Sequence, residues 1–357
     1  MISIVRRCST LAQNLAKESS KSVKSHIYEK PPVSSLEELN DYFLNNIIYN
    51  NQGLIVLNKP YGLRKESAIG LPQDRKKLIT KHPAIDKMEH LSFSGILRVL
   101  SGELGSDELN LIKIPERYIS GVSVLSTPKT AYKVHKSLIV PTALSYTYLA
   151  ICVGIPIKLS DSCRLGLTIK EKNGLKKAVF LEKVSKKSLQ QQLVVPIRMK
   201  YTTLATNDVL KVSLVRIQNN RNKWHALRAF CGLRMLAPVL GDTFYSSCVR
   251  TVLGRKMPVD PLSPLADFPC KLPNRLLSAL ELNRENTTLI PSHLHLSGVN
   301  LDKCEPKHIF VAKPPDHFLW TCQKLNLIVP DIYLENGLVD KSSYFQDSSK
   351  THPETSS

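Results

Sequence analysis

Residues 223–245 read KWHALRAFCGLRMLAPVLGDTFY, and this stretch does most to decide the fold. Its first half has the apolar spacing of a helix, and Arg228 lies on that helix. The second half, Pro238 to Tyr245, has the composition of a turn, in which we interpret Asp242 as a structural acid in preference to a second catalytic carboxylate. His225 begins the helix and fits a buried or capping histidine as well as it fits a substrate contact.

Three further segments combine a β-prone run with residues that can carry chemistry. They are GLIVLNKPYGL at 53–63, IPERYISGVSVLS at 114–126 and YTYLAICVGIP at 146–156. The first delivers Lys59 onto a Pro-Tyr-Gly turn, the second places Glu116 just ahead of an apolar strand, and the third carries Tyr148 within a strand.

In this order the four segments resemble the signatures of RluA-like pseudouridine synthases. Those signatures are N-K-P-x-G-L, R-L-D-x-x-T-S-G, K-x-Y-x-A-x-V-x-G-x-P, and H-Q-I-R-V-H-L followed by P-I-L-G-D-x-x-Y. Weaker matches at 290–296 and 310–325 extend the resemblance, which covers roughly Ile47 to Leu327. The longer spacing between Arg228 and Pro238 is similar to that of the animal mitochondrial branch.

The resemblance implies an α+β protein with a central mixed or antiparallel sheet, flanking helices and an RNA-binding cleft. It also implies an isomerase, an intramolecular transferase that converts uridine to pseudouridine in mitochondrial rRNA or mRNA without a metal or other cofactor. The residues expected to be catalytic are Glu116 at the nucleophile position, Tyr148 against the base and Arg228 orienting the carboxylate. The residues expected to bind RNA are Lys59, Arg117, Lys223 and His225.

The chain departs from the family signature around the nucleophile. Glu116 stands where the family has Asp, Ile114 where it has Arg, and Tyr146 where it has Lys. The extra methylene lengthens the side chain by roughly 1.5 Å, and a misplacement of about 1 Å can cost about a hundredfold in rate. Asp107 is an alternative carboxylate, although its surroundings favour a loop turn or helix cap. The alternative function is therefore a catalytically inactive RNA-binding or mitoribosome-assembly factor with the same fold.

Composition favours a polyanionic partner. The 357 residues carry 49 Lys and Arg against 30 Asp and Glu, a formal net charge of +19, which indicates nucleic acid before membrane. The eight cysteines are scattered without a C-x-x-C pair, so we expect reduced, mostly buried thiols and no zinc site. The uncharged run from Ser137 to Ile157 is broken by prolines, and we interpret it as buried strand rather than a membrane span.

The expected organisation is a mitochondrial transit peptide and linker at 1–33, a catalytic domain at 34–330 and a disordered tail at 331–357. A ragged basic terminus that helps to hold RNA is the alternative for the leader. The leader predicts the mitochondrial matrix, where RNA-granule proteins are candidate partners. Within the domain we expect helices at 36–45 and 129–138 and a hairpin at 47–58. Pro196 should confine its strand to a sheet edge.

Overall fold

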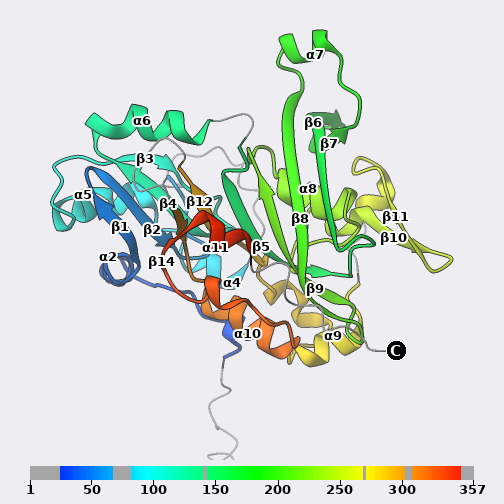
Figure 1. Cartoon of the computed structure of the whole chain (residues 1–357). Helices are drawn as coiled ribbons and strands as arrows, with labels where there is room; N and C mark the ends of the chain where they lie inside the picture. Colours follow the sequence, from blue (N-terminus) through cyan, green and yellow to red (C-terminus); the bar gives the residue numbers. More distant parts are fainter. Residues whose placement is uncertain (1–24, 67–81, 140–142, 268–270, 302–307, 347–357) are drawn as a thin grey trace, which may run out of the picture.

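The computed structural model describes residues 25–66, 82–139, 143–267, 271–301 and 308–346 (Figure 1). Within these residues a twelve-stranded sheet forms the centre, with the path β1-β2-β4-β12-β5-β9-β8-β6-β7. β13 and β14 continue from β12 at the side of this path, and β3 pairs with β4. β4 and β12 run parallel, whereas the other strand pairs along the path are antiparallel. The expected mixed sheet is therefore confirmed.

The strands have the following bounds: β1 Ile47–Asn51, β2 Leu54–Lys59, β3 Asn110–Lys113, β4 Ser120–Ser126, β5 Tyr146–Val153, β6 Ser160–Lys172, β7 Leu175–Leu181, β8 Val195–Asn207, β9 Val212–Asn219, β10 Val249–Val252, β11 Arg255–Pro258, β12 Leu294–Asn300, β13 Ile309–Val311 and β14 Gly337–Val339. The α-helices are α2 Leu36–Asn45, α4 Pro83–Asp86, α5 Phe93–Glu103, α6 Pro128–Leu138, α7 Lys186–Gln190, α8 Ala226–Leu233, α9 Asn274–Ala279, α10 Asp316–Lys324 and α11 Lys341–Gln346. Short 3₁₀ turns are η1 Ile27–Glu29, η2 Ser246–Cys248, η3 Pro264–Asp267, η4 Glu285–Leu289 and η5 Asp331–Tyr333.

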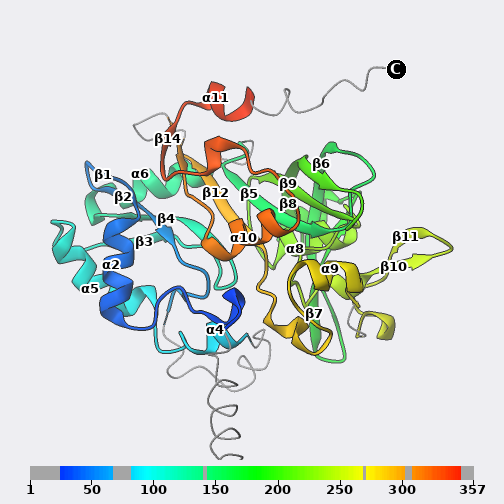
Figure 2. The ribbon, with the colours of Figure 1, turned by 90° about the horizontal axis from the view of Figure 1, so that it is seen from below.

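Helices cover both faces of the sheet, and the alternation along β5 shows how (Figure 2). Tyr148 and Ala150 pack into a core that also holds side chains of α6 and α8. Leu149 and Ile151, one residue out of phase, pack into a second core with α9 and α10. Successive side chains of a strand point to opposite faces, so both faces of β5 are buried. A third core joins α2 and α5 to the β1–β2 end of the sheet.

Two tight backbone positions explain the local sequence. The β1–β2 hairpin turns through Gln52 and Gly53, both with positive φ, as a two-residue type I′ connection requires. Gly121, in the Ser-Gly pair of the second signature, has a φ of 114° and lies against the backbone of Leu296 on the parallel strand β12. A side chain at this position would collide with that backbone, so glycine is required where β4 and β12 meet.

Several expected elements are confirmed: the helix at 36–45 has the predicted bounds, the second helix begins one residue early at Pro128, and the hairpin at 47–58 is β1–β2. The prediction for Pro196 is wrong, because its strand β8 lies inside the sheet between β6 and β9. β9 pairs with β8 only from Met199 onward, whereas Pro196 pairs with Gly166 of β6 alone. The missing N–H therefore falls where the third strand has already ended.

The packed region extends beyond the predicted domain at both ends. Tyr28 is buried and its hydroxyl lies 2.7 Å from Thr321 Oγ1, so the ordered body starts ahead of residue 34. Residues 331–346 are not disordered: β14 pairs with β13, and Tyr333 and Tyr344 are buried. The expectation of a disordered tail is wrong for these residues, because buried aromatic side chains anchor an otherwise polar segment. Residues 1–24 and 347–357, which carry the rest of both predictions, lie outside the described residues.

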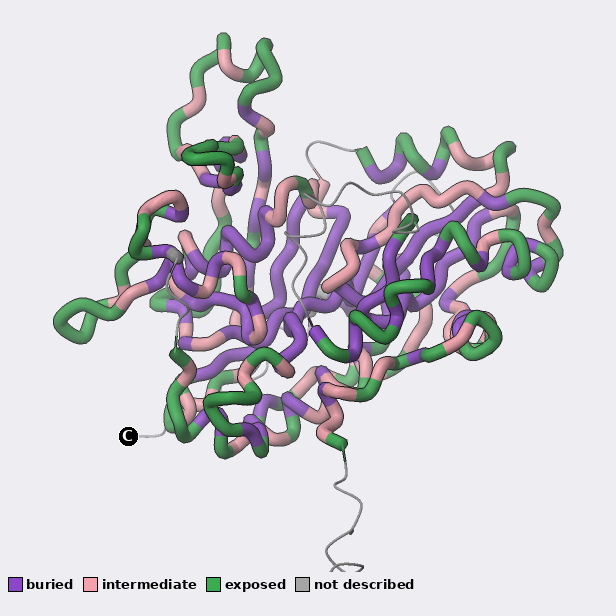
Figure 3. The backbone as a smooth tube through the Cα atoms, turned by 180° about the vertical axis from the view of Figure 1, so that it is seen from behind, coloured by how far each residue is buried: buried purple, intermediate pink, exposed green. Residues whose placement is uncertain are grey.

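Two hairpins project from the body, and their tips are exposed in Figure 3. One is β6–β7, continued by α7, and the other is β10–β11. The described cysteines are free, and four of these five are buried. Among the described helices, none combines the length and the apolar character that a bilayer crossing needs.

Candidate active site

Glu116 lies in the short connection between β3 and β4, with its side chain 32% exposed. The Tyr118 hydroxyl donates a hydrogen bond to Glu116 Oε2. His225 Nδ1 lies 3.4 Å from the same carboxylate oxygen and 2.5 Å from the Tyr118 hydroxyl. The three side chains therefore form a closed triangle around one oxygen of a partly exposed carboxylate.

His225 reaches this triangle through an unusual backbone. Trp224 and His225 have φ values of 50° and 59°, so two consecutive non-glycine residues adopt the left-handed conformation directly before α8. Such residues each cost about 1–3 kcal/mol and persist where the surrounding structure holds them. Phe244 contacts the His225 ring at a centroid distance of 5.6 Å, which supports it from the opposite side. The strained turn aims the imidazole at Glu116 instead of along the helix.

The surroundings of Glu116 favour its ionised form. Burial raises the pKa of the carboxyl, but the hydrogen bond and charge of His225, the Tyr118 hydroxyl and the charge of Arg228 lower it further, so that the pKa lies below its ordinary value. Hydrogen bonds to a carboxylate stabilise the charged state. Glu116 is therefore an anion at neutral pH, as both a nucleophile and a base require.

Arg228 is brought to the site, but its direct partner differs from the one expected. Its Nε donates to Asp242 Oδ1 at 2.7 Å, and a terminal nitrogen donates to the same oxygen. The guanidinium carbon lies 4.6 Å from the centre of the Tyr118 ring. Burial alone lowers the pKa of Arg228, but the Asp242 carboxylate holds it above its ordinary value. The expected direct pair with Glu116 is thus corrected: Arg228 acts on Glu116 through its charge and through Tyr118.

Asp242 fits the structural role predicted for it. Besides binding Arg228, it accepts hydrogen bonds from the backbone N–H groups of Phe244 at 2.8 Å and Tyr245 at 3.3 Å. Its side chain has no solvent exposure. A carboxylate saturated in this way fixes a turn and an arginine.

Tyr148 lies on β5 between Ile217 and Leu296 and is 1% exposed. Burial raises its pKa well above the ordinary value, and the nearby Glu116 charge acts in the same direction. Glu116 therefore lies close enough to Tyr148 for its charge to act on the phenol. Because protein covers the ring, the base contact expected for Tyr148 needs a local opening.

Two of the residues expected to bind RNA have structural roles instead. Lys59 is fully buried, and its ammonium donates to the carbonyls of Pro60 and Leu63 at 3.1 Å each. Burial lowers its pKa to about 7, with Arg117 contributing. Arg117 donates to the carbonyls of Gly62 and Ile85. Lys59 therefore closes the Pro-Tyr-Gly turn, and Arg117 ties this turn to the Glu116 loop.

The remaining predicted positions are accessible. Lys223 is exposed, with its ammonium 6.0 Å from the Trp224 ring centre, so its predicted RNA contact stays open. Asp107, the alternative carboxylate, is exposed in the loop between α5 and β3. The contact of Tyr118 with Glu116 was not predicted from the sequence; the position of Tyr118 two residues after Glu116 was the available signal. No group of three or more His, Cys, Asp or Glu that could hold a metal occurs among the described residues.

Comparison with known proteins agrees with this fold. No family model matches the chain. The mitochondrial mRNA pseudouridine synthase RPUSD3 of Bos taurus is 28% identical over 312 residues, which cover 84% of this chain and 82% of the relative. The mitochondrial pseudouridylate synthase RPUSD4 of Bos taurus is 22% identical and covers 80% of this chain and 70% of its own.

A solved structure, that of human RNA pseudouridylate synthase domain containing 4, superposes with a TM-score of 0.60 at 22% identity, over 83% of this chain and 98% of that chain. The architecture is therefore the pseudouridine synthase fold. Within that class, the chain is homologous to the mitochondrial RPUSD3 and RPUSD4 proteins.

Proposed function

We propose that this protein is a mitochondrial RNA pseudouridine synthase in which Glu116 supplies the reactive carboxylate. Support comes from the homology to named pseudouridine synthases and from the partly exposed carboxylate held by Tyr118 and His225. The carboxylate triangle carries the proposal, because it provides an ionised acid at the family's nucleophile position despite the change from Asp to Glu.

The reaction moves one bond within a nucleotide. The N1–C1′ glycosidic bond of uridine breaks, the uracil turns, and C5 joins C1′; C5 then loses a proton and N1 gains one, so no redox partner is required. Glu116 either forms a covalent adduct with the sugar or removes a sugar proton to promote the departure of uracil. Tyr118 and His225 hold the carboxylate in position, and the Arg228 charge favours its anionic form. A protein-covered site keeps the freed uracil from escaping.

We propose mitochondrial mRNA or rRNA as the substrate and the matrix as the compartment, with RNA-granule proteins as partners. The net charge of +19 and the exposed Lys223 support RNA binding. We also propose a transit peptide within the segment ahead of the packed residue Tyr28.

A pseudouridine map of mitochondrial RNA tests the function. Carbodiimide labelling and primer extension would be applied to cells that lack the protein and are rescued with wild type, Glu116→Gln or Asp107→Asn. Sites that disappear without the protein and return with wild type and Asp107→Asn, but not with Glu116→Gln, are the expected result. Return with Glu116→Gln would move the reactive carboxylate elsewhere. An unchanged map with altered ribosome assembly would instead establish a binding protein without turnover.

A further inference from the structure

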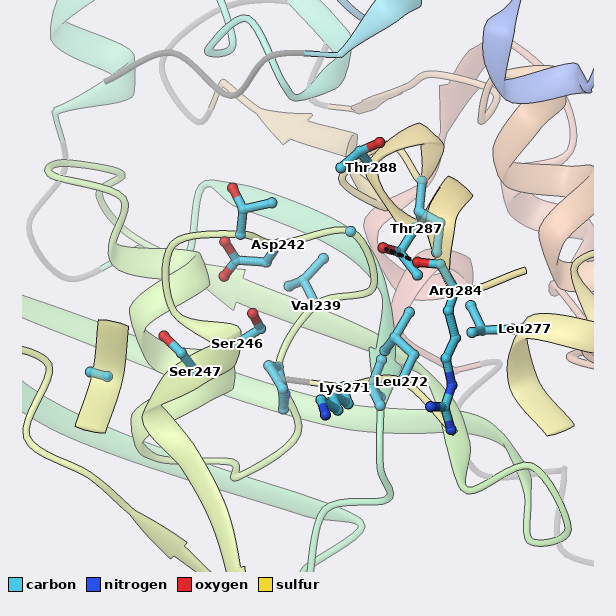
Figure 4. A pocket seen from close by; sticks show the side chains of 16 residues that line it. Val239, Asp242, Ser246, Ser247, Lys271, Leu272, Leu277, Arg284, Thr287 and Thr288 are labelled. Carbon is cyan, nitrogen blue, oxygen red and sulfur yellow. Dashed lines mark hydrogen bonds between the residues drawn. The ribbon is translucent and has the colours of Figure 1, made fainter. Parts of the chain in front are cut away.

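A cavity with a volume of about 540 Å³ lies beside the turn that carries Asp242 (Figure 4). Its walls come from the turn around Gly241, from η2, and from the region of α9 and η4. Val239, Leu277 and Ile290 give it an apolar interior. The volume falls within the range of roughly 300–1,000 Å³ that is usual for small-ligand sites.

The polar groups of the cavity are donors and cations. Ser246, Ser247 and Thr288 contribute hydroxyl groups. Lys271 and Arg284 contribute positive charge, both are exposed, and in Figure 4 their nitrogen-bearing ends point toward the same lower edge of the view. Among the described residues, neither cation forms an ion pair with a carboxylate, and Arg284 Nε donates to Asn274 Oδ1 at 3.0 Å, which leaves its terminal nitrogens to meet a ligand.

Asp242 is the acid that borders the cavity, and it does not oppose an anion there. Its oxygens already accept hydrogen bonds from Arg228 and from two backbone N–H groups. The charge available to a ligand is consequently that of the two cations. An apolar interior beside hydroxyl groups and paired cations matches a nucleotide, whose base is flat and largely apolar on its faces and whose phosphate is anionic.

We propose that this cavity binds one nucleotide, with the base against Val239 and Leu277 and the phosphate at Lys271 and Arg284. We take this nucleotide to be part of an RNA chain that also places a uridine at Glu116, and this part of the inference rests on the proposed function. A free nucleotide has the same chemistry, and the test separates the two. Sequence-specific RNA recognition commonly uses splayed single-stranded bases, which such a cavity suits.

The cavity is coupled to Glu116 through the turn 241–247. One side of this turn lines the cavity, while Phe244 on the other side lies 5.6 Å from the His225 ring and 5.5 Å from the Arg228 guanidinium carbon. A nucleotide that holds the turn in place therefore also holds the residues that position Glu116.

Equilibrium binding of the full chain to a fluorescein-labelled oligouridylate tests the proposal across a salt series, with UMP as competitor. Arg284→Ala removes a phosphate contact, so affinity should fall and the slope of log K against log salt should decrease by about one. Thr288→Phe fills the cavity without changing charge; it should lower affinity and leave the slope unchanged. Arg275→Ala, an exposed arginine on α9 that does not line the cavity, is the matched control and should bind as wild type does.

Each outcome decides the proposal. Unchanged affinity of Thr288→Phe for both oligouridylate and UMP overturns it, as does equal weakening by Arg275→Ala and Arg284→Ala, which would reveal diffuse charge. Loss of UMP binding in Thr288→Phe with intact oligouridylate binding supports the site with a free nucleotide as its source. Because these measurements need no turnover, they stand even if an unchanged pseudouridine map refutes the isomerase; comparable melting temperatures of the variants show that the fold is retained.

Discussion

Two histidine-containing regions of this molecule differ in their access to water. At the Glu116 site, the His225 side chain is 42% exposed and faces an acid. In the buried histidine cluster, formed by His82, His293, His295 and His317, His293 and His295 have no exposure. The His317 ring lies 5.7 Å from that of His293 and 5.0 Å from Tyr61.

The difference teaches that burial, not residue type, sets what a histidine can do. Desolvation lowers the pKa of His293 to about 3 and of His295 to about 4, so both are neutral hydrogen-bonding groups. His295 connects Ser120 of β4 with the carbonyl of Ala312. The cluster therefore joins elements of the fold, whereas His225 is free to act on an anion.

The largest effect is expected when the negative charge of Glu116 is removed. Glu116→Gln keeps the size of the side chain and its contact with Tyr118 but loses the charge, so pseudouridine formation should fall by about 10²–10⁴-fold. Single-turnover assays on a target RNA identified by the map measure this loss. Denaturant unfolding should show little change in stability; substantial activity in Glu116→Gln would remove it from the reactive role.

The buried ion pair should dominate stability near the site. Asp242→Asn leaves the Arg228 charge without its partner in a dry environment, a change that costs about 3–5 kcal/mol in comparable pairs. Urea unfolding at neutral pH measures it. The exposed pair of Lys158 and Asp161 supplies the control, since Asp161→Asn should change the free energy of unfolding by no more than about 1 kcal/mol. Equal effects of the two variants would contradict this account.

Lowering the pH should reduce the stability of the fold through the buried histidine cluster. The unfolded chain binds a proton at each histidine near pH 6.5, while folded His293 and His295 stay neutral down to about pH 3 and 4. Their contribution is thus complete above pH 6.5 and is lost as the pH falls, by about 2 kcal/mol per residue between pH 7 and pH 5.

Unfolding free energies at the two pH values measure that loss. His293→Leu should make the decline smaller than in wild type, because it removes one of the two histidines that stay neutral in the fold. A decline of the same size in His293→Leu and wild type would show that the cluster is not the acid-sensitive element.

The smallest effect is expected from Tyr118→Phe. Loss of one hydrogen bond from the hydroxyl to the carboxylate should raise the activation free energy by about 1–2 kcal/mol, which lowers the rate about five- to thirtyfold. Because the Tyr118 hydroxyl lowers the pKa of Glu116, its removal should raise that pKa and shift the acid limb of kcat/KM to higher pH. A pH–rate profile of both enzymes checks the direction; an acid limb that stayed in place would assign Tyr118 a purely structural role.

Local patterns predicted much of the fold. The helix at 36–45 and the hairpin at 47–58 follow from apolar periodicity and a turn that tolerates positive φ. The prediction that Pro196 confines its strand to a sheet edge was wrong, because the effect of a proline depends on where the neighbouring strand ends, and no local pattern contains that information. The prediction of a disordered tail was wrong for a related reason, since Tyr344 is buried by partners far away in the chain.

By itself the sequence determined the class of fold, the position of Glu116 and the basic character that favours RNA, because these depend on residue type, order and spacing. Only the tertiary structure decided that Arg228 pairs with Asp242, that Lys59 is buried, and that Tyr118 and His225 meet at one carboxylate oxygen. His225 lies 107 residues from Tyr118 in the chain. Burial and contact between such distant side chains arise when the sheet and its helices assemble, and these properties set the charge and partners of each group.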